Sequence, residues 1–270
     1  MVPGTLVPQH SSCCRAFKRG FFGLSAAQPG SERLDAPVGT LVVVGRPAKF
    51  SEARLLDAAL TVVGRDGAAA TTSAIAAAMG AGIGSLYYRF ANRDVLLLAL
   101  WVRSVRRFQV VFLGAACSSR DPGDALVAAA VAIPRYCREH PDEARALTLF
   151  RYEDVLARLD VSDDDLASCP DDLREAVLGL NDEVFAVMGE LTRRRFGSLE
   201  PLELVRIAVQ QTTYGLVRPF LGAGADPMPA WLDDVVAAMV PAALAVADRP
   251  GWGALRGENR TPGADAEGLE

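Results

Sequence analysis

Residues 71–90 read TTSAIAAAMGAGIGSLYYRF, and their spacing is typical of two short helices that cross at a tight turn. Ala76 is the small residue that such a crossing needs. Gly80 permits the sharp turn four positions later, and Leu86 is the apolar anchor six positions further on. The pattern therefore predicts a helix-turn-helix, with helices over about 72–79 and 83–89.

The second of these helices carries polar groups on its outer side. Leu86 and Phe90 are four residues apart and are expected to face inward. The side chains that then project elsewhere are Ser85, Tyr87, Tyr88 and Arg89. Hydroxyl and guanidinium groups suit phosphate oxygens and base edges in a DNA major groove. An alternative is that one tyrosine packs in the core with its hydroxyl at the rim.

Capping residues mark the neighbouring helices. Ser51 predicts a helix through residue 65 that ends at Gly67, Thr71 caps the next helix, and Asn92 caps a long helix from Arg93 to about residue 117. Breakers then predict five more helical segments, over about 122–140, 141–159, 170–197, 201–222 and 229–248. No strand pattern follows residue 45, so the fold class is all-α.

The composition excludes several classes of protein. The chain has 270 residues, of which 50% are hydrophobic and 23% charged, which is incompatible with disorder throughout. Its five cysteines show no CxxC spacing, so neither a disulfide scaffold nor a metal site is expected. Residues 67–88 carry no charge but are too rich in Gly, Ser and Thr for a membrane span. A reducing, cytoplasmic location fits best.

The distribution of charge and of helix-breaking Gly and Pro residues divides the chain into four parts. Residues 1–110 have a net charge of +7 and residues 111–270 one of −12, which suggests an anionic partner for the first part. We expect a disordered arm over 1–45, a helix-turn-helix domain over 46–95, a larger helical domain over 96–248 and a loose tail over 249–270. Arg46 and Lys49 precede the first helix, where they could reach DNA or form a solvated linker.

Residues 50–100 resemble the DNA-binding domain of the tetracycline-repressor (TetR) family. The shared features are LLDAAL in the first helix, T-x-x-x-I-A in the second, G-x-x-x-G-S-L-Y-Y-x-F across the turn and N-R-D-x-L-L at the start of the long helix. The resemblance implies an all-α homodimeric regulator. Such a protein is usually a repressor that binds a double-stranded, palindromic DNA operator and is released by a small-molecule effector.

The resemblance also implies which residues meet DNA. Thr72 and Ser73 would lie near it, and Arg93 would grip a phosphate. The third helix would contact bases and phosphates through Gly84, Ser85, Tyr87 and Tyr88. Where the family often has Ser and Lys, this chain has Gly82 and Ile83, and Arg89 replaces a frequent His. These departures leave the operator sequence open.

The helical remainder suggests a ligand pocket and a dimer interface but no catalytic site or cofactor. Large residues that could line a pocket are Trp101, Phe108, Phe112, Tyr136, Phe150, Phe185, Met188 and Tyr214. The resemblance implies a dimer interface on the last two helices, about 201–222 and 229–247. Two stripes there could form it or be buried within one chain; they are Leu204, Ala208, Gln211, Gly215 and Leu216, and Val236, Val240, Ala243, Leu244 and Ala247. Arg103, Arg106 and Arg107 are interpreted as a solvated face.

Two further hypotheses remain beside the repressor. A small-molecule binding or interaction module with a degraded DNA-reading helix would explain Gly82 and Ile83. An all-α enzyme is the weaker alternative. His140 precedes Pro141 and is interpreted as a helix-end residue, and Asp163, Asp164 and Asp165 are interpreted as a solvated loop or a helix cap rather than a metal site.

Overall fold

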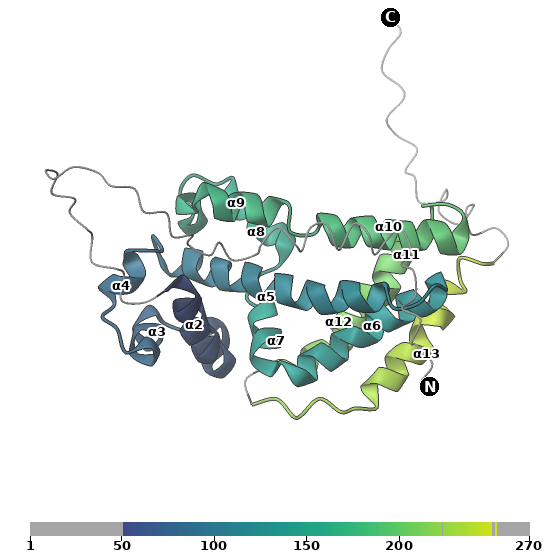
Figure 1. Cartoon of the computed structure of the whole chain (residues 1–270), viewed down its shortest axis with the longest axis horizontal. Helices are drawn as coiled ribbons and strands as arrows, with labels where there is room; N and C mark the ends of the chain where they lie inside the picture. Colours follow the sequence, from purple (N-terminus) through teal and green to yellow (C-terminus); the bar gives the residue numbers. More distant parts are fainter. Residues whose placement is uncertain (1–50, 223, 250–251, 253–270) are drawn as a thin grey trace, which may run out of the picture.

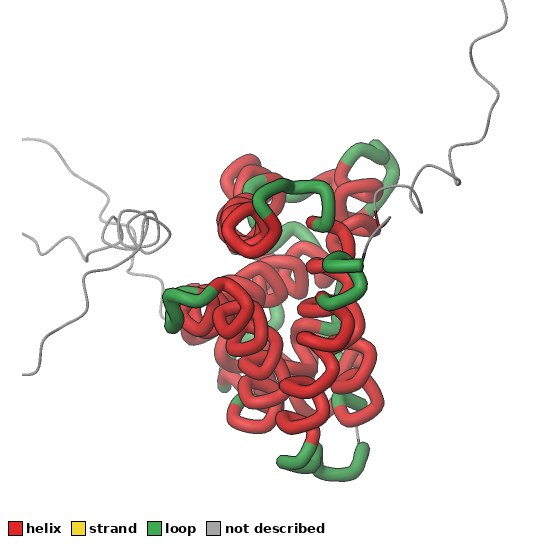
Figure 2. Tube along the Cα trace, turned by 90° about the vertical axis from the view of Figure 1, so that its right-hand side faces the viewer, coloured by secondary structure: helices red, strands yellow, loops and turns green. Residues whose placement is uncertain are grey.

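A computed structural model describes residues 51–222, 224–249 and 252, and throughout these the regular elements are helices. Helices α2 to α4 gather at one end, α5 runs along the molecule, and α10 to α13 lie at the other end (Figure 1). A view along the molecule shows the same all-helical build without a strand in the described part (Figure 2). The predicted arm over 1–45 lies outside these residues, as does nearly all of the predicted tail.

The bounds of the elements follow in chain order. The first part contains α2 (Glu52–Asp66), the 3-10 turn η2 (Gly67–Ala69), α3 (Thr72–Met79), α4 (Gly84–Tyr87) and α5 (Arg93–Ala116). The middle contains α6 (Pro122–Glu139), α7 (Pro141–Leu147), α8 (Tyr152–Leu159), η3 (Asp165–Ser168), α9 (Asp171–Leu178) and α10 (Asp182–Phe196). The last part contains α11 (Leu202–Arg206), the π-helical turn η4 (Ile207–Gln211), α12 (Thr212–Val217), η5 (Arg218–Phe220) and α13 (Leu232–Leu244).

The predicted caps are confirmed. Thr71 accepts a hydrogen bond from the Ala74 N–H at 3.1 Å, and Asn92 accepts one from the Val95 N–H at 2.9 Å. The third predicted cap, Ser51, caps α2 in the same way, and a further cap, Asp121, stands at the start of α6. Each such cap contributes about 1 kcal/mol by satisfying an amide that the helix leaves unpaired.

Two expected long helices are broken in the structure. The segment 141–159 divides into α7 and α8, and the segment 170–197 divides into α9 and α10. At the second break, side chains from other segments bond the backbone carbonyls that the interrupted helix leaves without partners. The Tyr152 hydroxyl donates to the Leu178 carbonyl at 3.1 Å, and the Gln109 amide donates to the Leu180 carbonyl at 2.9 Å. These partners are distant in sequence, so local patterns do not reveal the break.

Two hydrophobic cores meet along α5. The first joins the buried faces of α2, α3 and α4 to the first half of α5, and it also includes buried residues of α8, η3 and α9 such as Val155, Leu166 and Val177. The second joins the end of α5, from Phe112, to α6, α10, α11, α12 and α13. The boundary between the cores therefore falls within α5 rather than at its start.

Candidate nucleic-acid interface

The turn between α3 and α4 has the geometry that the sequence predicts. Gly80 ends α3 with φ 67°, a left-handed conformation that favours glycine, and the Ala81 N–H donates to the Ala76 carbonyl at 3.0 Å. Ile75 and Leu86 are fully buried below the crossing. Helical backbone angles extend from Ile83 to Tyr88, which agrees with the helix expected over 83–89.

The expected DNA contacts on this unit are accessible. Tyr88 is 84% exposed and Tyr87 49% exposed, so neither tyrosine is buried in the core. Ser73, Gly84 and Ser85 are exposed as well. The Thr72 hydroxyl lies 3.5 Å from the Tyr87 hydroxyl, which links the start of α3 to α4. The structure therefore brings these hydroxyl groups onto one surface.

Two arginines border this surface. The Arg93 guanidinium donates from Nε to the Ala70 carbonyl at 2.7 Å and from Nη2 to the Ala68 carbonyl, so it holds the loop that leads into α3. Its phosphate contact remains a prediction, since a phosphate would compete with these carbonyls. Arg89 is half-buried just after α4, the second helix of the helix-turn-helix and therefore its expected recognition helix. Residues 71–88, which precede both arginines in the sequence, contain no charged side chain. Arg46 and Lys49 lie outside the described residues.

Two salt-bridging arginines hold the helix-turn-helix against the rest of the chain, although the sequence pattern indicates a solvated face for one of them. Arg103 of α5 donates to the Leu56 carbonyl and to the Asp57 carboxylate, both at 2.8 Å, and its burial lowers its pKa. Arg145 of α7 donates to the Gly64 carbonyl at 2.7 Å. The solvated-face interpretation is therefore wrong for Arg103. The long reach of an arginine to another helix is not visible in local spacing.

A second attachment joins the start of α5 to the segment before α9. The Asn92 amide donates to the Asp165 carbonyl at 2.6 Å, and Arg158 bonds the Asp94 carboxylate at 2.7 Å and the Asp164 carboxylate at 3.0 Å. Asp163 and Asp165 are exposed, and Asp164 caps η3. In the described part of the chain, no three His, Cys, Asp or Glu side chains are grouped for a metal ion.

The eight residues expected to line a pocket lie in different parts of the packing, and none of them lines the cavity described below. Trp101 packs edge-on against Phe150 in the first core, with ring centroids 6.0 Å apart. Phe108 packs against the second core and lies 5.3 Å from the ring of Tyr136. Phe112 and Met188 are fully buried in the second core, and Phe185 and Tyr214 are about two-fifths exposed. Most of these residues are packing residues of the two cores.

Tyr136 belongs to a polar network beside this packing. Its hydroxyl donates to Glu143, which also accepts from Arg107. Burial raises the pKa of Tyr136, so the phenol stays protonated. Burial also acts to raise the pKa of Glu143, but the two hydrogen bonds outweigh it and hold that pKa below its ordinary value. The network fastens α7 to α5 and α6.

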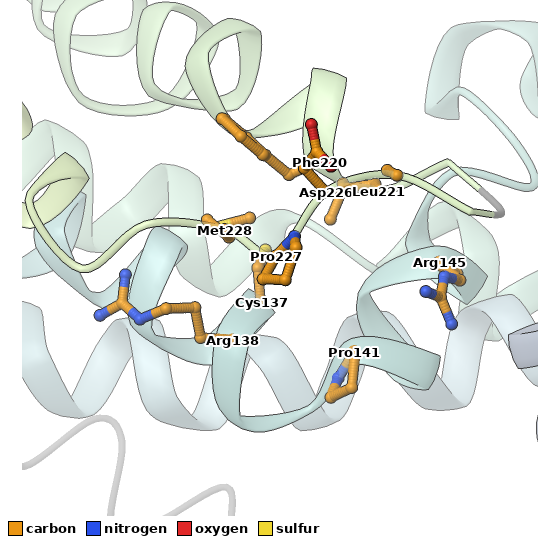
Figure 3. A pocket seen from close by; sticks show the side chains of 10 residues that line it. Cys137, Arg138, Pro141, Arg145, Phe220, Leu221, Asp226, Pro227 and Met228 are labelled. Carbon is orange, nitrogen blue, oxygen red and sulfur yellow. The ribbon is translucent and has the colours of Figure 1, made fainter.

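A cavity of about 440 Å³ lies elsewhere, between the ends of α6 and α7 and the segment before α13 (Figure 3). Its lining combines apolar and charged residues: Cys137, Arg138, Pro141, Arg145, Phe220, Leu221, Ala225, Asp226, Pro227 and Met228. The Asp233 carboxylate accepts hydrogen bonds from Nη1 and Nη2 of Arg138, at 2.7 and 2.8 Å, so the charge of Arg138 is compensated. The Nε of Arg145 is buried without a hydrogen-bond partner. Burial raises the pKa of the Cys137 thiol to about 12, so it is neutral.

The last helices bury one apolar stripe and expose another. Val236, Val240 and Leu244 are buried within the chain, so this stripe takes the alternative that the sequence left open. Ala208 is also buried, whereas Gln211 and Gly215 are exposed and Leu204 and Leu216 are half-buried. The large hydrophobic residues of α11–α13 that remain exposed are Ile207, Tyr214, Trp231 and Val235. The spacing of Trp231 and Val235 could have identified this second face of α13.

None of the described helices is both long and apolar enough to cross a membrane.

Residues 55–100 match the model of a family described as bacterial regulatory proteins, tetR family. No curated protein sequence matches the chain.

Solved structures of regulators share the fold. The TetR family transcriptional regulator PfmR from Thermus thermophilus aligns with a TM-score of 0.52 and 20% identity, over 73% of this chain and 96% of that one. A transcriptional regulator from Rhodococcus sp. RHA1 aligns at 0.53 and 20%, over 72% and 96%. The fatty acid degradation regulator FadR from Bacillus halodurans aligns at 0.50 and 16%, over 73% and 96%. At identities this low, these alignments show a common fold, which is a helix-turn-helix domain followed by a helical domain.

Proposed function

We propose that this chain, which carries the N-terminal domain of the tetR family of bacterial regulatory proteins and the fold of that family's regulators, represses transcription from a palindromic operator and is released by a small molecule. The observation that carries the proposal is the intact helix-turn-helix, whose exposed face presents Tyr87, Tyr88, Ser73 and Ser85. Hydroxyl groups on a protruding helix can donate to phosphates and base edges in the major groove. A regulator of this kind would act in the cytoplasm, where bacterial DNA is held.

Selective recognition of a DNA sequence requires a homodimer, because one short helix contacts too few base pairs to be selective. The apolar residues left exposed on α11–α13 support it. Trp231 is 59% exposed and Tyr214 42% exposed, and faces of this kind are typical of protein interfaces. We expect sedimentation to give twice the monomer mass of 28.7 kDa. A parent protein that is monomeric at micromolar concentration would contradict this proposal. The variant Trp231→Asp, which places a charge on the exposed apolar face, should be monomeric.

The cavity beside α7 is our candidate for the effector site. Arg145 lines it and also bonds the Gly64 carbonyl of α2, so a ligand that moves Arg145 would disturb the helix-turn-helix. We propose residues 96–248 as the ligand-binding and dimerisation part and residues 46–95 as the DNA-binding part. A compound that releases the protein from DNA should lose its effect when Met228→Trp fills the cavity.

The absence of charge from residues 71–88 favours a second candidate function. Because this segment contains no Lys or Arg to contact phosphates, the chain could instead be a small-molecule binding or interaction module whose DNA-reading helix has degraded. Both candidates predict a folded dimer, but only the regulator predicts selective DNA binding.

One experiment separates these two functions. The purified protein is incubated with short genomic fragments at near-physiological salt, and the retained DNA is sequenced. We expect enrichment of a palindromic site that is lost in Tyr88→Ala and weakened in Tyr87→Phe. Leu178→Ala, at an exposed apolar position on α9, is the control and should bind like the parent. Added salt should weaken binding steeply, because phosphate contacts release counterions. Parent-like binding by both tyrosine variants would contradict the assigned contacts.

A further inference from the structure

The exposed face of the recognition helix is apolar at its leading end. Ile83 begins the helical turn that leads into α4 and is 43% exposed. It is preceded by the exposed Gly82, so no neighbouring side chain covers it on that side. An isoleucine held on the surface at this point is unusual for a protein that meets a polyanion, because it can neither donate a hydrogen bond nor neutralise a phosphate.

Ile83 shares its side of the helix with Tyr87. The two residues are one helical turn apart, and the Tyr87 N–H points to the Ile83 carbonyl at 3.5 Å. The Tyr87 hydroxyl in turn lies 3.5 Å from that of Thr72. The aliphatic group of Ile83 is therefore fixed next to a hydroxyl pair on the face that the proposed function directs at DNA.

The major groove offers one apolar group, the C5-methyl of thymine. Guanine is read mainly by Arg or Lys, and residues 71–88 contain neither. We infer that Ile83 is a specificity-determining residue that contacts a thymine methyl group in each half of the operator. This inference rests on the proposed function and adds the base chemistry that the reading face accepts.

The size of the effect follows from the burial of one methyl group. Removing a single buried methyl-sized contact should weaken binding about fourfold per half-site, and about fifteenfold when both halves of a palindrome are changed. Uracil supplies this change, because it keeps every hydrogen-bonding group of thymine and lacks only the methyl.

The test uses a fragment that the parent protein retains, synthesised with each thymine replaced in turn by deoxyuridine. We expect one symmetric pair of positions at which uracil weakens the parent about fifteenfold. Ile83→Ala should bind the thymine fragment more weakly and lose most of the discrimination at that pair. Ile83→Val, which keeps a branched apolar group, should retain it. Melting temperatures of the variants verify folding, since Ile83 lies on the surface.

The outcomes distinguish the two levels of the argument. Equal binding of thymine and uracil at every position, on a fragment that the parent retains, would overturn the inference and leave the proposed function intact. Discrimination that is undiminished in Ile83→Ala would also overturn it, because another residue would then contact the methyl. If the parent retained no fragment better than Tyr88→Ala does, both the proposed function and the inference would be wrong.

Discussion

Gly64 offers a direct test of how α7 is fitted against α2, the first helix of the helix-turn-helix unit. A Cβ atom placed on Gly64 would lie 2.3 Å from Oδ1, 2.4 Å from Cγ and 2.9 Å from Cβ of Asp142. Rotation of the Asp142 side chain can relieve the first two contacts but not the third, because the Asp142 Cβ is fixed by the backbone of α7. Gly64→Ala therefore forces α7 away from α2.

Two opposing terms determine the magnitude. Overpacking of this kind costs about 1–3 kcal/mol. Alanine inside a helix is favoured over glycine by about 1 kcal/mol, and Gly64 lies inside α2. We expect Gly64→Ala to lower the free energy of unfolding by about 1 kcal/mol when Asp142 is present. In an Asp142→Gly background all three close atoms are absent, so the same change should raise it by about 1 kcal/mol.

Thermal or urea unfolding of the parent, both single variants and the double variant completes the cycle. The expected coupling energy is about 2 kcal/mol, and each kcal/mol should appear as a shift of about 2–4 °C in Tm. If Gly64→Ala stabilised the parent as much as it stabilised the Asp142→Gly variant, the close fit of α7 on α2 would be refuted.

Three further substitutions test other contacts. Arg103→Ala removes the bonds to α2 and should cost about 2 kcal/mol, with Arg103→Lys recovering only part of it in urea unfolding because an ammonium lacks the guanidinium fork. Asn92→Ala removes a cap and a bond to the segment before α9, and its Tm should reflect a loss of about 1–2 kcal/mol; a loss no larger than that of Leu178→Ala would contradict this role. Asp233→Asn should cost about 2 kcal/mol at pH 7. Although burial opposes the shift, hydrogen bonds from two arginines hold the pKa of Asp233 below its ordinary value of 3.8, so the deficit should begin to shrink as the pH falls below about 3.8 and keep shrinking until the pH reaches the lowered value. A deficit that stayed constant down to about pH 3 would show that the carboxylate charge is not involved.

The helix-turn-helix could be predicted because its determinants are local. Thr71, Gly80 and Leu86 act within a few residues of where they stand, through a cap, a left-handed turn and an anchor. The exposure of Tyr87 and Tyr88 follows from the same helical periodicity once Leu86 points inward.

The cavity and the helix breaks could not be predicted in this way, because distant residues determine them. The break between α9 and α10 depends on Gln109, about seventy positions away along the chain. The cavity forms where Cys137 and Arg145 meet the segment around Met228, and aromatic residues expected in a pocket, such as Trp101 and Phe112, were needed to fill the cores instead. Periodicity shows that a residue is turned inward but not whether the space it faces is filled.

The core that α2, α3 and α4 share with α8, η3 and α9 has a consequence for protein engineering. A cassette limited to the reading helices would leave behind the partners of its own apolar surface, among them Val155, Leu166 and Val177. A chimera meant to transfer the proposed DNA specificity to another helical domain would have to carry those partners along, or rebuild the surface that they cover. In this chain, the segment that would have to be transferred together with the proposed specificity is therefore larger than the helix-turn-helix itself.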